Sequence, residues 1–138
     1  MDLKVINDFF AGDRLAKHLN IHIKEAERDY AVCVMKVTDE LLNAKDTVHG
    51  GALFSLADYT FAVAANAENI ISGRSGATVS QSAEIKYIRP ALGSEIRAVA
   101  KCTHREGVKS YYEIEMFDDG DQLVSLAKVK GHTLGDPS

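Results

Sequence analysis

Residues 50–67 read GGALFSLADYTFAVAANA, and small or apolar side chains fall on every face of a helix drawn through them. A helix that is apolar all round has to be buried, because a helix at the surface needs a polar face toward water. Segments on both sides of this run alternate apolar and polar residues with the period of two that is typical of strands. We therefore expect one long, buried central helix with a sheet wrapped around it.

The remaining segments predict the order of the other elements. An amphipathic helix is expected over residues 3–19, with a break near Ala11 and Gly12. A short helical turn capped by Thr38 is expected over 38–42, and a loop over 68–77. Hairpin turns favour an antiparallel sheet, in which the four strands after the central helix form a meander. The predicted class is α+β in one domain, residues 1–138, with strands over 21–26, 30–37, 78–88, 94–104, 109–117 and 123–133.

Charge and cysteine content exclude several classes of protein. Lys and Arg total 16 and Asp and Glu total 20, so the net charge of −4 disfavours a duplex nucleic acid as partner. No segment approaches the roughly 20 apolar residues of a membrane span, and charges interrupt the start of the chain, so we expect no membrane partner. Cys33 and Cys102 lie far apart and outside any CxxC motif. This pattern excludes a disulfide scaffold and indicates a cytoplasmic protein.

Asp58 is the acidic residue within the apolar run. An ionised carboxylate is costly to bury without partners, so chains seldom place one there by accident. Its position makes Asp58 a candidate catalytic or binding group. The structural alternative is a carboxylate that pairs with an arginine or caps a neighbouring loop.

His49, Gly50 and Gly51 lie at the expected start of the central helix. A helix N-terminus presents unpaired N–H groups and a partial positive charge, and glycine lets a substrate oxygen approach them closely. Such an arrangement can polarise a carbonyl group. The plainer interpretation is a tight turn at Gly50 and Gly51 with a structural histidine beside it. Asn43, taken alone, is typical of a turn.

Other catalytic motifs are absent from the sequence. It contains no GxSxG nucleophile elbow, no HExxH zinc motif and no GxxxxGK[ST] phosphate loop. Histidines and cysteines do not cluster, so we expect neither a metal nor another cofactor.

Three blocks of the sequence carry a family resemblance: Leu42-Asn43, VHGGALFSLAD over 48–58, and IKYIRPA over 85–91. Together they resemble the hotdog-fold acyl-CoA thioesterases, specifically the phenylacetate-pathway (PaaI-like) branch, over nearly the whole chain. The resemblance implies that Asp58 is the nucleophile or general base. It also implies that the Gly50 N–H binds the thioester oxygen. Asn43 is then the residue that orients the thioester or the water.

The same resemblance implies an assembly. His49 is expected beside the thioester, and the site is built from two subunits, so homodimers that join into homotetramers are expected. Several relatives with a glutamate carry Ser or Thr one helical turn after the acid, whereas this chain has Ala62 there. The role of that hydroxyl is therefore not carried over to this chain.

An acyl-CoA substrate sets further expectations. Phe54, Tyr59 and Phe61, with Gly51, are candidates to bind an aryl- or short-to-medium-chain acyl group, although aromatic side chains also pack cores. Arg89 and Arg105 are candidates for the CoA phosphates, as are Arg74 and Lys109, although exposed cations are mostly solvated. Two other functions stay open: a hotdog hydratase or dehydratase, and a non-catalytic acyl-CoA-binding protein. The first usually needs a histidine inside the helix, and residues 50–67 contain none.

Overall fold

The structure is a computed structural model and describes residues 1–135. The helices are α1 (Leu3–Phe10), α2 (Arg14–His18), the 3₁₀ turn η1 (Asp39–Leu41) and α3 (Gly50–Ser72). The strands are β1 (Ile21–Glu27), β2 (Tyr30–Lys36), β3 (Ala77–Tyr87), β4 (Glu95–Glu106), β5 (Lys109–Phe117) and β6 (Leu123–Leu134).

Within these residues the strands form one antiparallel sheet in the order β1-β2-β4-β5-β6-β3. The predicted meander is correct for β4, β5 and β6 but wrong for β3, which pairs with β6 instead of β4. The segment after β3 crosses one end of the sheet, where the Ala91 carbonyl accepts a hydrogen bond from the Val48 N–H. β3 is therefore an edge strand, joined to the sheet on one side.

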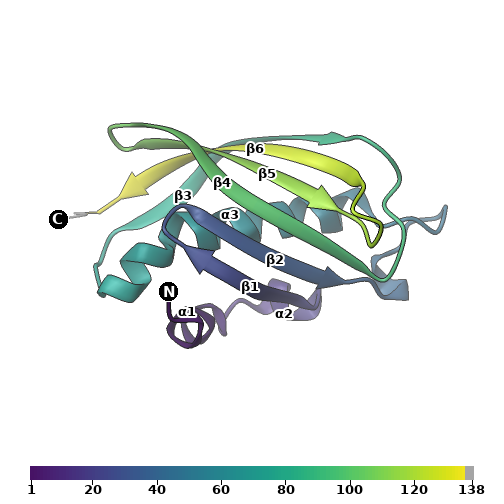
Figure 1. The fold of residues 1–138 in the computed structure, drawn as a ribbon, viewed down its shortest axis with the longest axis horizontal. Helices are drawn as coiled ribbons and strands as arrows, with labels where there is room; N and C mark the ends of the chain where they lie inside the picture. The colour runs from purple at the N-terminus through teal and green to yellow at the C-terminus, as the bar shows by residue number, and fades with distance from the viewer. Residues whose placement is uncertain (136–138) are drawn as a thin grey trace.

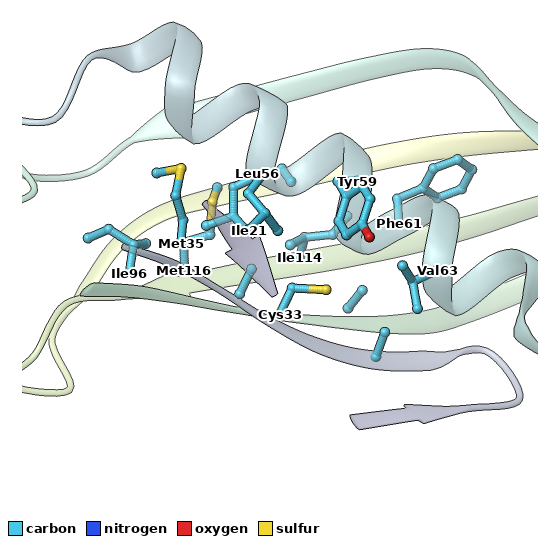
Figure 2. Packing of buried hydrophobic residues seen from close by; sticks show 14 of the residues in the cluster. Ile21, Cys33, Met35, Leu56, Tyr59, Phe61, Val63, Ile96, Ile114 and Met116 are labelled. Atoms are coloured by element: carbon cyan, nitrogen blue, oxygen red, sulfur yellow. The ribbon is translucent and has the colours of Figure 1, made fainter. Parts of the chain in front are cut away.

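The sheet curls around α3, and the core lies between them (Figure 1). Leu56 and Val63 project from α3 toward the strands that carry Ile114 and Cys33 (Figure 2). Phe61 also meets Tyr112 edge to face, with 5.2 Å between ring centroids. Each fully buried side chain of this size stabilises the fold by about 1.5–3 kcal/mol. A sheet wrapped around one long helix is the hotdog architecture, so the predicted fold class is confirmed.

α3 is longer than predicted. It continues to Ser72, so the loop expected over 68–77 is wrong for residues 68–72. Gly73 ends the helix with a φ of +69°, and its N–H donates to the carbonyls of Asn69 and Ile70. The polar residues of the last turns led to the prediction of a loop. Glu68 does not face the core, because it forms an ion pair with Arg28, 3.0 Å away. No helix among the described residues is long and apolar enough to cross a membrane.

The N-terminal segment divides into α1 and α2, as the break near Ala11 and Gly12 predicted. Asp13 begins α2, and its carboxylate accepts a hydrogen bond of 3.0 Å from the Ala16 N–H. The helical turn after β2 is also confirmed as η1. The predicted capping role of Thr38 is wrong, because its side chain makes no capping hydrogen bond.

One stripe of α3 is left uncovered. Gly51, Phe54 and Asp58 are exposed on it, so the expectation that α3 is buried on all sides is wrong for the single chain. Most residues of β3 are exposed as well, including Val79 and Tyr87. The apolar character of α3 and β3 therefore exceeds what this chain alone can bury.

Candidate active site

The first turn of α3 is fixed by His49. Its Nδ1 accepts a hydrogen bond of 3.0 Å from the Gly51 N–H. Because Nδ1 accepts, the proton of the neutral ring is assigned to Nε2. The Gly50 N–H has no acceptor among residues 1–135. Of the two adjacent glycines, Gly50 therefore offers a free donor at the positive end of the helix.

Tyr87 holds the same peptide from the other side. Its hydroxyl donates a hydrogen bond of 3.1 Å to the Gly50 carbonyl. A Cβ atom on Gly50 would lie 3.1 Å from Cζ of this ring, so glycine leaves room for the tyrosine. Sequence reasoning noted the segment that contains Tyr87 but did not assign the residue to the site. The contact joins β3 to α3 across 37 positions, which no local pattern reveals.

Asp58 lies on the uncovered stripe of α3, where it lines a pocket of about 80 Å³ with Ser55 and Ala62. The expectation that the Asp58 side chain is enclosed is wrong for the single chain, in which this residue is exposed. Partial burial still raises the pKa of Asp58, the Ser80 hydroxyl beside the carboxylate opposes this shift, and repulsion from Asp13 adds to it. Among residues 1–135, Asp58 forms no ion pair. The arginine-paired alternative therefore has no support.

Within one chain, Gly50 and Asp58 are too far apart to contact the same thioester carbonyl. They are eight residues apart on α3, which is about 12 Å along the axis at roughly 1.5 Å per residue. A thioester carbonyl bound at the Gly50 N–H is out of reach of the Asp58 carboxylate of the same chain.

Asn43 organises the loop that leads to α3. Its side-chain N–H donates to Oγ1 of Thr47, 2.9 Å away, and its Oδ1 accepts from the N–H groups of Lys45 and Thr47. The role of a turn residue is confirmed. A role in orienting the thioester or a water stays a prediction.

The other residues predicted to bind substrate are distributed along α3 and the sheet. Arg89 follows Tyr87 by two residues and donates to Oε1 of Gln122 at 2.9 Å, which places it near the Gly50 end. Phe54 is exposed one turn into α3, whereas Tyr59 is 9% exposed and packs edge to face on Phe10.

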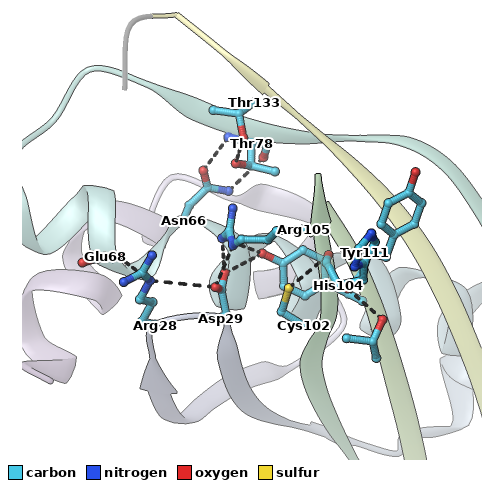
Figure 3. Close-up of polar contacts among 12 residues, drawn as sticks. Arg28, Asp29, Asn66, Glu68, Thr78, Cys102, His104, Arg105, Tyr111 and Thr133 are labelled. Carbon is cyan, nitrogen blue, oxygen red and sulfur yellow. Dashed lines mark hydrogen bonds and ion pairs between the residues drawn. The ribbon is translucent and has the colours of Figure 1, made fainter. Parts of the chain in front are cut away.

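Arg105 lies at the opposite end of α3 (Figure 3). Its guanidinium binds both carboxylate oxygens of Asp29, and the Tyr112 hydroxyl donates to Oδ1 of Asp29 at 2.6 Å. The Asp29 N–H donates to the carbonyl of Ala64, about 21 Å along α3 from Gly50. Arg105 and Arg74 line one pocket of about 170 Å³ there. The structure thus separates Arg105 from the Gly50 end of its own chain.

A model of the thioesterase superfamily matches residues 45–125. The acyl-coenzyme A thioesterase PaaI of Escherichia coli (strain K12) is 34% identical over 127 residues, which cover 91% of this chain and 86% of that protein. The structure of the E. coli PaaI protein from the phenylacetic acid degradation operon superimposes with a TM-score of 0.84 at 30% identity, covering 96% of this chain and 93% of that one. For a variant of the phenylacetic acid degradation protein PaaI from Thermus thermophilus, the TM-score is 0.74 at 26% identity, over 86% and 96% of the two chains. By sequence and by fold, this chain belongs to the thioesterase superfamily, as a hotdog-fold thioester hydrolase of the PaaI-like branch.

Proposed function

We propose that the protein hydrolyses an aryl- or short-to-medium-chain acyl-CoA to the free acid and coenzyme A. The observation that carries the proposal is the Gly50 N–H at the start of α3, which has no acceptor within residues 1–135, together with the Asp58 carboxylate on the same helix, which forms no ion pair within those residues. The first can bind a thioester oxygen, and the second can act on the carbonyl carbon or on a water.

The site is completed by a second copy of the chain. Gly50 and Asp58 of one protomer lie about 12 Å apart, whereas a single carbonyl must touch both groups. β3 is an exposed edge strand beside the uncovered stripe of α3, and such an edge readily pairs with another chain. In the proposed homodimer these surfaces meet, so that Gly50 of one protomer faces Asp58 of its partner. Two such dimers then join into a homotetramer.

Hydrolysis proceeds through negative charge on the thioester oxygen. The Gly50 N–H stabilises this charge, and losing one such donor typically lowers the rate by about 10²–10³. His49 lies beside the thioester, with Nε2–H as its available donor. Asp58 either attacks the carbonyl carbon to form a mixed anhydride, which water then hydrolyses to the free acid and the Asp58 carboxylate, or removes a proton from a water that attacks the carbonyl carbon itself. In both routes the carbon–sulfur bond breaks and the CoA thiolate leaves. Asn43 orients the thioester or that water.

Binding of the rest of the substrate is assigned to two groups of residues. Gly51, Phe54 and Tyr59 contact the acyl half. The CoA phosphates are assigned to Arg89 of one protomer and to the partner's Arg105, because the two α3 helices run in opposite directions when each Gly50 faces the other chain's Asp58. The Nη1 donors of Arg105 have no acceptor among the described residues.

A panel of acyl-CoA thioesters, assayed with a thiol-detecting reagent, tests the proposal directly. The wild-type protein should release coenzyme A, and Asp58→Asn should lower kcat by about 10²–10⁴. Asp8→Asn is a matched control that should keep wild-type turnover, since Asp8 is an exposed aspartate on α1 whose carboxylate pairs with Lys4. Near-normal turnover by Asp58→Asn would remove Asp58 from the mechanism.

A further inference from the structure

The stripe of α3 that the sheet leaves uncovered has an aromatic side chain at its centre. The exposed residues of this stripe are Gly51, Phe54 and Asp58, whose spacing of three and four positions places them on one face of the helix. Phe54 is 38% exposed in the single chain and has no polar side-chain atom. An apolar ring therefore separates the Gly50 donor from the Asp58 carboxylate along this face.

The proposed dimer fixes where its two-fold axis crosses α3. A closed pair of identical chains has an interface in which residue i contacts residue j of the partner and residue j contacts residue i. When Gly50 faces Asp58 of the partner subunit, the two α3 helices are antiparallel and the axis passes midway between these two positions. Position 54 is that midpoint, four residues from each. Phe54 is therefore the residue of the stripe that meets its own copy.

Two contacts show how β3 runs beside α3. The Asn66 side chain exchanges hydrogen bonds of 2.8 and 2.9 Å with the backbone of Thr78, near the start of β3. At the other end of the strand, the Tyr87 hydroxyl donates to the Gly50 carbonyl at 3.1 Å. β3 is therefore antiparallel to α3, and each step of one residue along β3 corresponds to about two residues along α3.

The charges of β3 fit an axis at the same level. Phe54 lies four residues after the first residue of α3, which is level with Ile85, about two residues before the last residue of β3. If β3 pairs with β3 of the partner about Ile85, Glu84 lies directly opposite the partner's Lys86, and opposite charges in this position are favourable. An axis at Glu84 or at Lys86 would instead set that charge against its own copy. Neither residue forms an ion pair within residues 1–135, so both are available to the partner.

We propose that Phe54 lies on the two-fold axis of the dimer, where its ring packs on Phe54 of the partner subunit and the two rings form a wall shared by both active sites. The inference rests on the proposed function, because it takes the pairing of Gly50 with the partner's Asp58 from there. Each thioester carbonyl then lies about 6 Å from the axis along α3, at roughly 1.5 Å per residue. Both rings contact each acyl group, which suits an aryl group, since aromatic rings pack favourably on one another.

Crosslinking at position 54 tests the axis without any substrate. The background variant is Cys102→Ser, which leaves Cys33 as the remaining native thiol, and Cys33 is fully buried. In this background, Phe54→Cys should be joined into covalent dimers by a short bis-maleimide, because two thiols on the axis face each other. Ile71→Cys is the matched control, since Ile71 is also 38% exposed on α3. Its two copies would lie about 50 Å apart along the helices, at roughly 1.5 Å per residue, so this variant should run as a monomer on a denaturing gel.

A charge at the same position tests whether this contact holds the dimer. Phe54→Glu should fold with an unchanged circular dichroism spectrum, because the side chain is exposed in the single chain. Its two carboxylates would face each other on the axis, so the dissociation constant of the dimer, measured by sedimentation, should rise at least about tenfold. Ile71→Glu should keep the wild-type dissociation constant. The kcat/KM of Phe54→Glu should increase with protein concentration, because Gly50 needs Asp58 of the partner subunit.

The outcomes separate the two proposals. If the wild-type protein releases no coenzyme A from any thioester but Phe54→Cys is crosslinked and Ile71→Cys is not, the axis stands and the proposed chemistry is wrong. If thioesters are hydrolysed but Phe54→Cys is crosslinked no better than Ile71→Cys, the hydrolase stands and the position of the axis is overturned. Equal dissociation constants for Phe54→Glu and Ile71→Glu would overturn it as well.

Discussion

Asp29 lies at the turn between β1 and β2, where it contacts residues of β4, β5 and α3. Its carboxylate accepts hydrogen bonds from Arg105 and from the Tyr112 hydroxyl, and its backbone N–H donates to Ala64 of α3 (Figure 3). Its φ is +59°, a left-handed value that Asp and Asn adopt more readily than other side chains. Asp29→Ala removes both acceptors and strains the turn.

The loss of stability follows from three contributions. Tyr112 is 1% exposed, and a buried hydroxyl without an acceptor costs about 1–3 kcal/mol. The Arg105 side chain is 42% exposed, so solvent screening limits the ion pair to about 1 kcal/mol. The left-handed backbone adds about 1 kcal/mol for alanine. We expect Asp29→Ala to lower the free energy of unfolding by about 4 kcal/mol, which corresponds to a melting temperature lower by roughly 10–15 °C.

Urea unfolding of the wild type, Asp29→Ala and Asp29→Asn measures this loss. Asparagine tolerates the positive φ and keeps an acceptor for Tyr112, so Asp29→Asn should lose only the ion pair, about 1 kcal/mol. Equal losses in the two variants, or a loss below about 1 kcal/mol in Asp29→Ala, would refute the assignment of Tyr112 and the backbone as the main contributors.

Three further predictions concern the site and a fourth concerns the core. Burial raises the pKa of Asp58, so the folded state favours its protonated form, and the stability this group contributes is lost as the pH rises through that pKa. Asp58→Asn should therefore have a melting temperature at pH 7 no lower than that of the wild type. In the wild type, the acid limb of the kcat/KM profile should lie at a pH above the pKa of an ordinary aspartate. Tyr87→Phe removes the hydroxyl that holds the Gly50 carbonyl and should lower kcat by about tenfold while KM stays nearly constant; equal changes in both would contradict a positioning role. Arg105→Met should raise KM for acyl-CoA with kcat unchanged if its free donors bind a CoA phosphate, and an unchanged KM would leave Arg105 as a partner of Asp29 alone. Burial raises the pKa of the Cys33 thiol to about 12, so a thiol reagent at pH 8 should leave Cys33 unlabelled in the native protein and label it after unfolding; fast native labelling would contradict this burial.

The sequence alone determined the features that depend on neighbouring residues. The apolar run from Gly50 onward predicted α3 and its start, because a stretch of consecutive residues is enough to show which faces of a helix are apolar. The alternation that buries Tyr112, Ile114 and Met116 predicted which face of β5 meets the core. Asp58 stood out by the same reasoning, as a charge in an apolar context.

Only the tertiary structure decided which segments meet. Alternation assigns a face to β3 but not a neighbour, so its pairing with β6 was missed. The exposure of Asp58 depends on which stripe of α3 the sheet leaves uncovered. The hydrogen bond from the Tyr87 hydroxyl to the Gly50 carbonyl joins residues 37 positions apart. The charge of Arg105 predicts a role in substrate binding, but only the fold shows that its guanidinium also binds Asp29, 76 positions away. Such contacts arise from packing between distant elements, which short-range patterns do not encode.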